Sequence, residues 1–223
     1  IGAYGDDDGG STAGQTYLIL GSATGWAMDT DLSTADASFI GEDGDDESGY
    51  SVTGVGDVNG DGYDDFAIGA YGDDDGGNAA GQTYLILGSA NGWAMDTDLS
   101  TADASFIGED GGDYSGTSVT GVGDVNGDGY DDFAIGAPYD EDGGSAAGQT
   151  YLILGSASGW AMDTDLSTAD ASFIGEDGND YSGWSVTGVG DVNGDGYDDF
   201  AIGAYGDDDG GSFAGQTYLI LGS

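Results

Sequence analysis

The sequence has no lysine, arginine, histidine or cysteine, and its 44 acidic residues give a formal net charge of −44. Without cationic side chains it offers no electrostatic footprint for nucleic acid, so no nucleic-acid partner is expected. It also lacks the usual general bases, thiol nucleophiles and Schiff-base amines, which leaves carboxylates, hydroxyls and bound metals for any chemistry. Since no intramolecular salt bridge between side chains can form, crowded carboxylates repel one another unless a cation binds between them.

Large aliphatic side chains are also scarce, because Leu, Ile, Val and Phe make up only about 17% of the residues. A low apolar content combined with a high net charge is typical of disordered chains, whereas 14 Tyr and four Trp favour a folded core. The chain has no apolar run of about 18 residues, so membrane insertion is not expected. Composition alone therefore leaves order and disorder open.

What the sequence does contain is a tandem repeat with a period of 67 residues. The repeat units are residues 1–67, 68–134 and 135–201, followed by a partial unit at 202–223. The first unit differs from the second at six positions and from the third at eight. The chain opens at Ile1 in the middle of a motif, without a recognisable signal peptide. We therefore expect it to be a window cut from a longer repeat polypeptide.

Each repeat contains four short segments rich in Val, Ile, Tyr, Phe and Thr, bounded by Gly or Asp, which is typical of strands. In one cycle they are Ser118–Val125, Asp132–Ala137, Gln149–Leu154 and Ala171–Ile174. This pattern predicts an all-β fold of tandem four-stranded antiparallel sheets, each burying its apolar faces against its neighbours. The intervening GWAMDTDLSTAD segment is predicted to hold a short helical turn. Its tryptophans are interpreted as packing residues, with sugar stacking as the alternative; they are Trp26, Trp93 and Trp160.

The loop DVNGDGYDD stands between the first two predicted strands of each sheet and carries the clearest chemistry. Oxygen ligands at positions 1, 3 and 5 with Gly at position 6 are the pattern of a tight calcium loop. An EF-hand is excluded, because position 12 is Ile and strands flank the loop. The two aspartates at positions 8 and 9 can supply a closing carboxylate, and position 9 is the better one because the chain re-enters a strand there. A donor set of hard oxygens alone favours Ca²⁺. The candidate ligands, with Tyr contributing its backbone carbonyl, are Asp57, Asn59, Asp61, Tyr63 and Asp65; Asp124, Asn126, Asp128, Tyr130 and Asp132; and Asp191, Asn193, Asp195, Tyr197 and Asp199.

The stretch DYSGWSVTGVGDVNGDGYDDFAIGA resembles FG-GAP repeats, the blades of integrin α-subunit β-propellers and of many bacterial surface proteins. Ile135–Gly144 keeps the Gly-Ala-Pro element, whereas the other copies have Gly-Ala-Tyr, and Ser-Gly replaces the usual Phe-Gly. The resemblance implies calcium binding by the loops just described. The resemblance does not settle the architecture, because propellers of this family usually have about seven blades, more than three repeat units and a partial unit can form. The chain is expected to form part of a propeller, alone or with a second chain, or an open stacked array.

Two further acidic motifs, GDDDGG and GEDGDDESG, recur along the chain, and we interpret them as solvated hairpin tips. Second calcium sites are the alternative. A catalytic carboxylate pair is disfavoured, because nothing differentiates the pKa values of carboxylates repeated in every unit. The differences between repeats cluster at Ser11–Thr12, Thr24 and Asp45–Tyr50 with their equivalents, which are expected to be exposed loops.

These observations predict a non-enzymatic, calcium-stabilised repeat protein, extracellular or at the cell surface, with a structural or adhesive role. We expect it to associate with itself or with further copies of the same repeat, which could build a filament. The alternative is a ligand-binding β-propeller module that recognises a cell-surface protein or a glycan through loops that vary among repeats.

Overall fold

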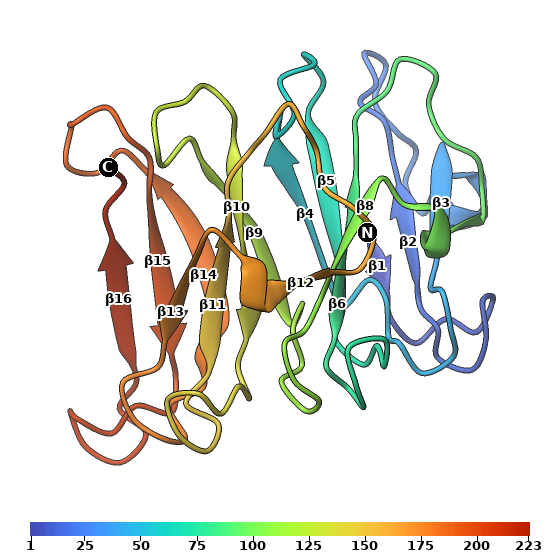
Figure 1. The fold of residues 1–223 in the computed structure, drawn as a ribbon. Coiled ribbons are helices and arrows are strands. Elements are labelled where there is room, and N and C mark those ends of the chain that lie inside the picture. The colour runs from blue at the N-terminus through green and yellow to red at the C-terminus, as the bar shows by residue number, and fades with distance from the viewer.

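Four β-sheets lie side by side in the computed structural model, which describes all 223 residues (Figure 1). The first contains β1 (Gly2–Ala3), β2 (Gln15–Leu18), β3 (Ala37–Ile40) and β7 (Thr97–Asp98). The second contains β4 (Ser51–Gly56), β5 (Asp65–Ala70), β6 (Gln82–Ile86), β8 (Ala104–Ile107) and β12 (Thr164–Asp165). The third contains β9 (Ser118–Gly123), β10 (Asp132–Ala137), β11 (Gln149–Ile153) and β13 (Ala171–Ile174). The fourth contains β14 (Ser182–Gly190), β15 (Asp199–Ala204) and β16 (Gln216–Ile220).

The principal strands of each sheet are consecutive in sequence and antiparallel, as predicted. In the third sheet Phe133 of β10 lies opposite Ile153 of β11 and Gly121 of β9, with a register shift near Asp132. The four predicted strand segments are therefore confirmed, two of them ending slightly earlier than expected. The sheets form an open row with the two termini in its first and last sheets (Figure 1). No helix in it is long and apolar enough to cross a membrane.

Neighbouring sheets come into close contact at their first strands, and glycine makes this approach possible. A Cβ atom at Gly121 in β9 would lie 2.9 Å from the carbonyl oxygen of Gly54 in β4. The Oγ of Ser51 in β4 accepts a hydrogen bond of 3.1 Å from the backbone N–H of Val119 in β9. The same bond recurs between Ser118 and Val186 at 3.2 Å. The sheets are thus joined in a repeated way by their own first strands.

Two very short strands add a connection that the sequence pattern did not predict. β7 pairs in parallel with β3 of the first sheet, and β12 pairs in parallel with β8 of the second. Each comes from the repeat that follows the sheet it joins, so the antiparallel strands of the first two sheets gain an outer parallel strand. A two-residue Thr-Asp strand is too short to carry the alternation by which strands are recognised in sequence.

The predicted helical turn is present as a short 3-10 helix in each cycle: η1 (Leu32–Thr34), η2 (Leu99–Thr101) and η3 (Leu166–Thr168). The preceding aspartate caps each turn; in η2 the Asp98 carboxylate accepts from the backbone N–H of Ser100. Leu99 and Leu166 are fully buried, so η2 and η3 anchor their connections to the core, whereas η1 has no buried residue.

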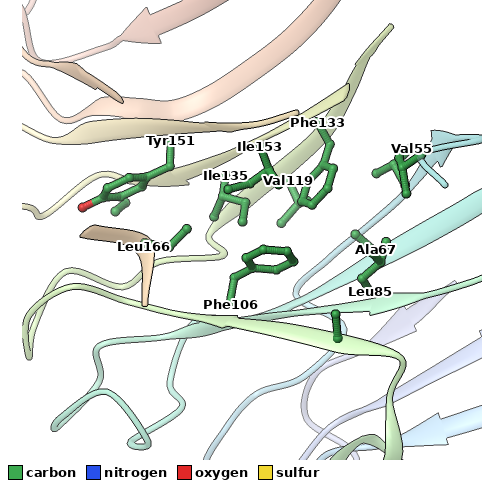
Figure 2. Close-up of a cluster of buried hydrophobic side chains, with 13 residues drawn as sticks. Val55, Ala67, Leu85, Phe106, Val119, Phe133, Ile135, Tyr151, Ile153 and Leu166 are labelled. Atoms are coloured by element: carbon green, nitrogen blue, oxygen red, sulfur yellow. The ribbon is translucent and has the colours of Figure 1, made fainter. Parts of the chain in front are cut away.

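The core lies between sheets, because each sheet is too small to bury its own apolar face. Figure 2 shows Phe106 of the second sheet facing Phe133 and Ile135 of the third, within a cluster of 13 buried residues. The rings of Phe106 and Phe133 meet edge to face with centroids 5.5 Å apart. Burying side chains of this size contributes roughly 1.5–3 kcal/mol each. A sheet therefore depends on its neighbour for most of its stability.

The recurring tryptophans pack against these clusters, as favoured from the sequence. Trp93 contacts the rings of Phe39 and Phe66, and Trp160 those of Phe106 and Phe133, with centroids 6.0–6.4 Å apart. Trp26 is the exception, with 62% of its surface exposed.

Backbone amides are the main hydrogen-bond donors to the carboxylates of this chain. Asp36, Asp103 and Asp170 accept from the N–H groups of Leu20, Leu87 and Leu154 at 2.8–2.9 Å. In a chain without cationic side chains, such charge-assisted bonds are the available way to fix a carboxylate.

Candidate metal sites

The three acidic loops connect β4 to β5, β9 to β10 and β14 to β15, so they lie along one edge of the sheet row (Figure 1). We call this the loop edge. Within the first loop the Asp57 carboxylate accepts from the backbone N–H groups of Asp61 at 3.0 Å and Gly62 at 2.9 Å. The Asn59 side-chain oxygen accepts from Asp61 N–H at 2.8 Å, and Asp61 accepts from Tyr63 N–H. The turn thus draws the side-chain oxygens of positions 1, 3 and 5 inward.

Glycine has two separate purposes in this loop. Gly62 at position 6 has φ +92°, so it makes the sharp turn that the sequence pattern predicted. Gly60 at position 4 has φ +74°, and a Cβ there would lie 2.5 Å from the ring of Tyr130 in the next loop. Tyr130 therefore packs over the preceding loop, and Tyr197 does the same over Gly127.

The aspartate at position 9 is buried in every loop, at Asp65, Asp132 and Asp199. Asp65 accepts from the N–H groups of Val58 at 3.0 Å and Gly88 at 2.6 Å. Burial raises the pKa of Asp65, and the nearby charges of Asp61 and Asp57 raise it further. Burial likewise raises the pKa of Asp132 to about 6. These carboxylates are thus desolvated beside other negative charges, an environment that a bound cation stabilises.

The donor set fits a calcium ion chemically. Each loop offers carboxylate and amide oxygens at positions 1, 3, 5 and 9 and a backbone carbonyl at position 7, all of them hard oxygen donors. The structure gathers no group of three acidic side chains at metal-binding spacing. The fit therefore rests on the identity of the donors and on the charged, desolvated carboxylate at position 9.

The aspartate at position 8 has a part that the sequence did not reveal. The Asp131 carboxylate accepts from the backbone N–H of Asp57 in the preceding loop at 2.9 Å, and Asp198 does so from Asp124 at 3.1 Å. The sequence interpretation had grouped positions 8 and 9 as possible closing carboxylates. In the structure position 9 faces its own loop, whereas position 8 links consecutive loops. The Asp-Asp doublet was the only signal in the sequence for this division.

The other acidic motifs lie at the opposite edge of the sheets and are not simple solvated tips. Asp46 and Asp113 from the GEDG motifs and Asp73 and Asp140 from the GDDD-type motifs are buried. Burial raises the pKa of Asp46 and Asp113 to about 7 and that of Asp73 to about 6. Only the remaining part of each motif is solvated as expected, Asp74 being an exposed example.

A buried tyrosine links each pair of these motifs across the sheet interface. The hydroxyl of Tyr84 lies 3.1 Å from the Glu42 carboxylate and 3.0 Å from that of Asp73. The equivalent hydroxyl of Tyr151 meets Glu109 and Asp140. One hydroxyl proton can serve only one carboxylate at a time, so each arrangement keeps an excess of negative charge.

Comparison with known proteins agrees with this architecture. The family model for the FG-GAP repeat matches residues 48–86, 115–153 and 182–220, together more than half of the chain. The chain belongs to the FG-GAP repeat family. Each FG-GAP match begins at or shortly before the first strand of a sheet and ends with its third strand, so it includes one acidic loop.

Integrin alpha chains are among the curated relatives of this FG-GAP protein. It is 36% identical over 166 residues to Integrin alpha-PS2 of Drosophila melanogaster, covering 72% of this chain and 12% of that protein. It is 34% identical over 176 residues to Integrin alpha-6 of Gallus gallus, covering 76% and 14%. It is 32% identical over 174 residues to Integrin alpha-6 of Homo sapiens, covering 76% and 13%. The chain thus matches only a small part of the length of these relatives.

Proposed function

We propose that this FG-GAP chain is a non-enzymatic, calcium-stabilised repeat protein of the extracellular space or cell surface, with a structural or adhesive role. The observation that carries the proposal is the row of three identical DVNGDGYDD loops along one edge, each linked to the next by an aspartate carboxylate. The similarity to integrin alpha chains supports adhesion at a cell surface.

Calcium would be held by the oxygens at positions 1, 3, 5, 7 and 9 of each loop, from Asp57 to Asp65 in the first. A bound ion supplies positive charge where the chain has none, and extracellular calcium suffices for weak sites of this class. Calorimetric titration of chelator-treated protein is expected to give three calcium ions per chain. Replacing Asp57, Asp124 and Asp191 together by Asn is expected to weaken binding at all three, and unchanged binding would contradict the ligand assignment.

Self-association is proposed from the exposed face of the fourth sheet. Leu152 in the third sheet and Val125 in its acidic loop are 7% and 5% exposed, whereas their equivalents Leu219 in the fourth sheet and Val192 in its loop are each 54% exposed. The same apolar face is thus covered inside the row and uncovered at its end. A further repeat or another copy of the chain would cover it, and such an unclosed contact propagates into a filament. Negative-stain microscopy is expected to show continuous rods, whereas discrete rings or monomers would contradict filament formation.

The second candidate is a ligand-binding module, favoured by the position of the differences between repeats. Seven of the eight positions that differ between the first and third units lie at the edge opposite the acidic loops, in the connections or, for Trp184, at the start of β14. Variation concentrated at one edge is typical of a recognition surface built on a constant scaffold. Glycan and protein arrays test this function. Assays for activity on polysaccharides test whether the protein is instead an enzyme.

A further inference from the structure

Seven tyrosines form a continuous row along the edge opposite the calcium loops. The connections that enter the first strand and leave the second strand of each sheet all lie at this edge, which we call the tyrosine edge. Successive ring centroids are 4.5–5.9 Å apart along the whole row. The row consists of Tyr4, Tyr50, Tyr71, Tyr114, Tyr139, Tyr181 and Tyr205.

The row persists although its members come from non-equivalent positions of the repeat. Tyr50 has Thr117 as its equivalent in the next unit, and there Tyr114 replaces Glu47. Pro138 stands where other units have tyrosine, and the following residue, Tyr139, replaces a glycine. In repeats this similar, substitutions that remove one ring are accompanied by another that restores the row.

The rings are only partly buried, and they border an open groove. A groove of about 420 Å³ is lined by Tyr50, Tyr71, Tyr114, Thr117, Tyr139 and Trp184. Trp184 extends the row, since its ring lies 6.2 Å from that of Tyr139 and 5.1 Å from that of Tyr205. Most neighbouring rings meet edge to face or tilted, and only Tyr181 and Tyr205 are stacked, so the row offers those parts of the ring faces that its neighbours leave uncovered, beside hydroxyl groups.

Carboxylates stand directly beside this groove. Tyr139 also lines an adjoining cavity of about 390 Å³ together with Asp110, Asp113, Asp140, Glu141 and Asp142. On the other side, Tyr71 donates a hydrogen bond to the Glu47 carboxylate. The chain has no cationic side chain with which these groups could pair. The ring faces and the carboxylates therefore both attract a cation supplied by another molecule.

We propose that the tyrosine edge is a docking surface for a linear polysaccharide carrying free amino groups, such as a polymer of glucosamine. A sugar polymer presents flat faces at regular intervals, which suits a row of rings. Its hydroxyl groups donate to the carboxylates, and its ammonium groups complement their charge. Anionic polysaccharides are repelled from the same surface. This inference rests on the second function proposed above, ligand binding. In it the polysaccharide contacts the protein directly, without a calcium ion between them.

Calorimetric titration of the full chain, in saturating calcium and slightly below neutral pH, tests the proposal. The probes are a hexamer of β-1,4-linked glucosamine, the same hexamer fully N-acetylated, and a six-residue arginine peptide. The glucosamine hexamer is expected to bind, the N-acetylated hexamer to bind about tenfold more weakly, and added salt to weaken binding. Equal binding of both hexamers, tighter binding of the peptide, or no binding of the glucosamine hexamer would overturn the proposal.

Variants locate the surface. Tyr139→Ser and Trp184→Ser are each expected to weaken binding of the glucosamine hexamer about tenfold, whereas Tyr139→Phe retains it. Trp26→Ser is the matched control, because Trp26 is an exposed ring in a connection at the loop edge. Equal losses in Trp26→Ser and Tyr139→Ser, with unchanged circular dichroism, would refute the location. If arrays find a neutral glycan or a protein ligand instead, the binding function stands and this inference fails; if they find no ligand, both fail.

Discussion

The two edges of the sheet row are built from the same repeat, but they differ in how similar its copies are. At the loop edge DVNGDGYDD is identical in all three copies, whereas the opposite edge holds most of the differences between units. The loops contact one another, because Asp131 and Tyr130 of one loop reach Asp57 and Gly60 of the loop before it. The tyrosine edge instead keeps a chemical type, aromatic rings beside carboxylates. The hydrogen bonds and close backbone packing between loops demand identical residues, whereas the tyrosine edge demands only a suitable chemical character.

Removing calcium from the loop edge is expected to have the largest effect on stability. Three calcium ions would reduce the net negative charge only from −44 to −38, but they would bind where carboxylates are most crowded. With millimolar calcium well above the dissociation constants, a chelator is expected to lower the melting temperature by on the order of 20 °C. Circular dichroism melts with and without chelator measure this. Superimposable curves would contradict calcium stabilisation, and magnesium serves as the control ion.

Changing pH should reveal the buried carboxyls of the tyrosine edge. Because burial raises the pKa of Asp113 to about 7, the folded chain binds more protons than the unfolded chain between about pH 4 and pH 7. This contribution to stability is complete below the unfolded pKa and is lost as pH rises through about 7.

Asp113→Asn should therefore flatten the fall in stability between about pH 5 and pH 8, by on the order of 2 kcal/mol. Denaturant titrations at saturating calcium measure the difference from the original chain. Asp74→Asn is the control, because Asp74 is exposed. Parallel pH profiles for the original chain and Asp113→Asn would show that Asp113 titrates normally.

The link between loops is tested by two equivalent aspartates. Asp131 accepts from Asp57 N–H in the preceding loop, whereas Asp64, at the same position of the first loop, is exposed and accepts no hydrogen bond. Asp131→Ala is expected to lower the free energy of unfolding by about 1–2 kcal/mol, and Asp64→Ala by less than about 0.5 kcal/mol. Urea titrations compare them, and equal losses would mean that the contact between loops contributes nothing.

The smallest expected difference concerns two glycines with the same backbone conformation. Gly60 and Gly194 have φ +74° and +77°, but only at Gly60 would a Cβ meet another atom, in the ring of Tyr130. Alanine at either position introduces about 1 kcal/mol of backbone strain, and Gly60→Ala adds about 1 kcal/mol from displaced packing. Thermal melts of the two variants isolate the packing contribution. If they melt together, the ring moves aside at no cost.

The sequence predicted what depends on one repeat and missed what depends on two. Strands such as Asp132–Ala137 follow from local composition, and the loop ligands follow from spacing within nine residues. The link made by Asp131, the burial of Asp73 and Asp113, and the strand β7 all arise where one sheet meets the next. The sequence pattern within one repeat does not determine the orientation of the neighbouring sheet or the groups that this sheet buries. The calcium ligands themselves remain a prediction.

The parallel strands β7 and β12 give the chain a direction of assembly. Phe39 in the first sheet pairs with Thr97, and Phe106 in the second pairs with Thr164, so each of these two sheets is completed by residues 58 positions further along the chain. During synthesis, the outer edge of such a sheet stays uncovered until most of the following repeat, including β7 or β12, has left the ribosome. Folding then advances from the N-terminus one repeat behind translation, and the exposed edge at each moment is the one that the next repeat is about to occupy.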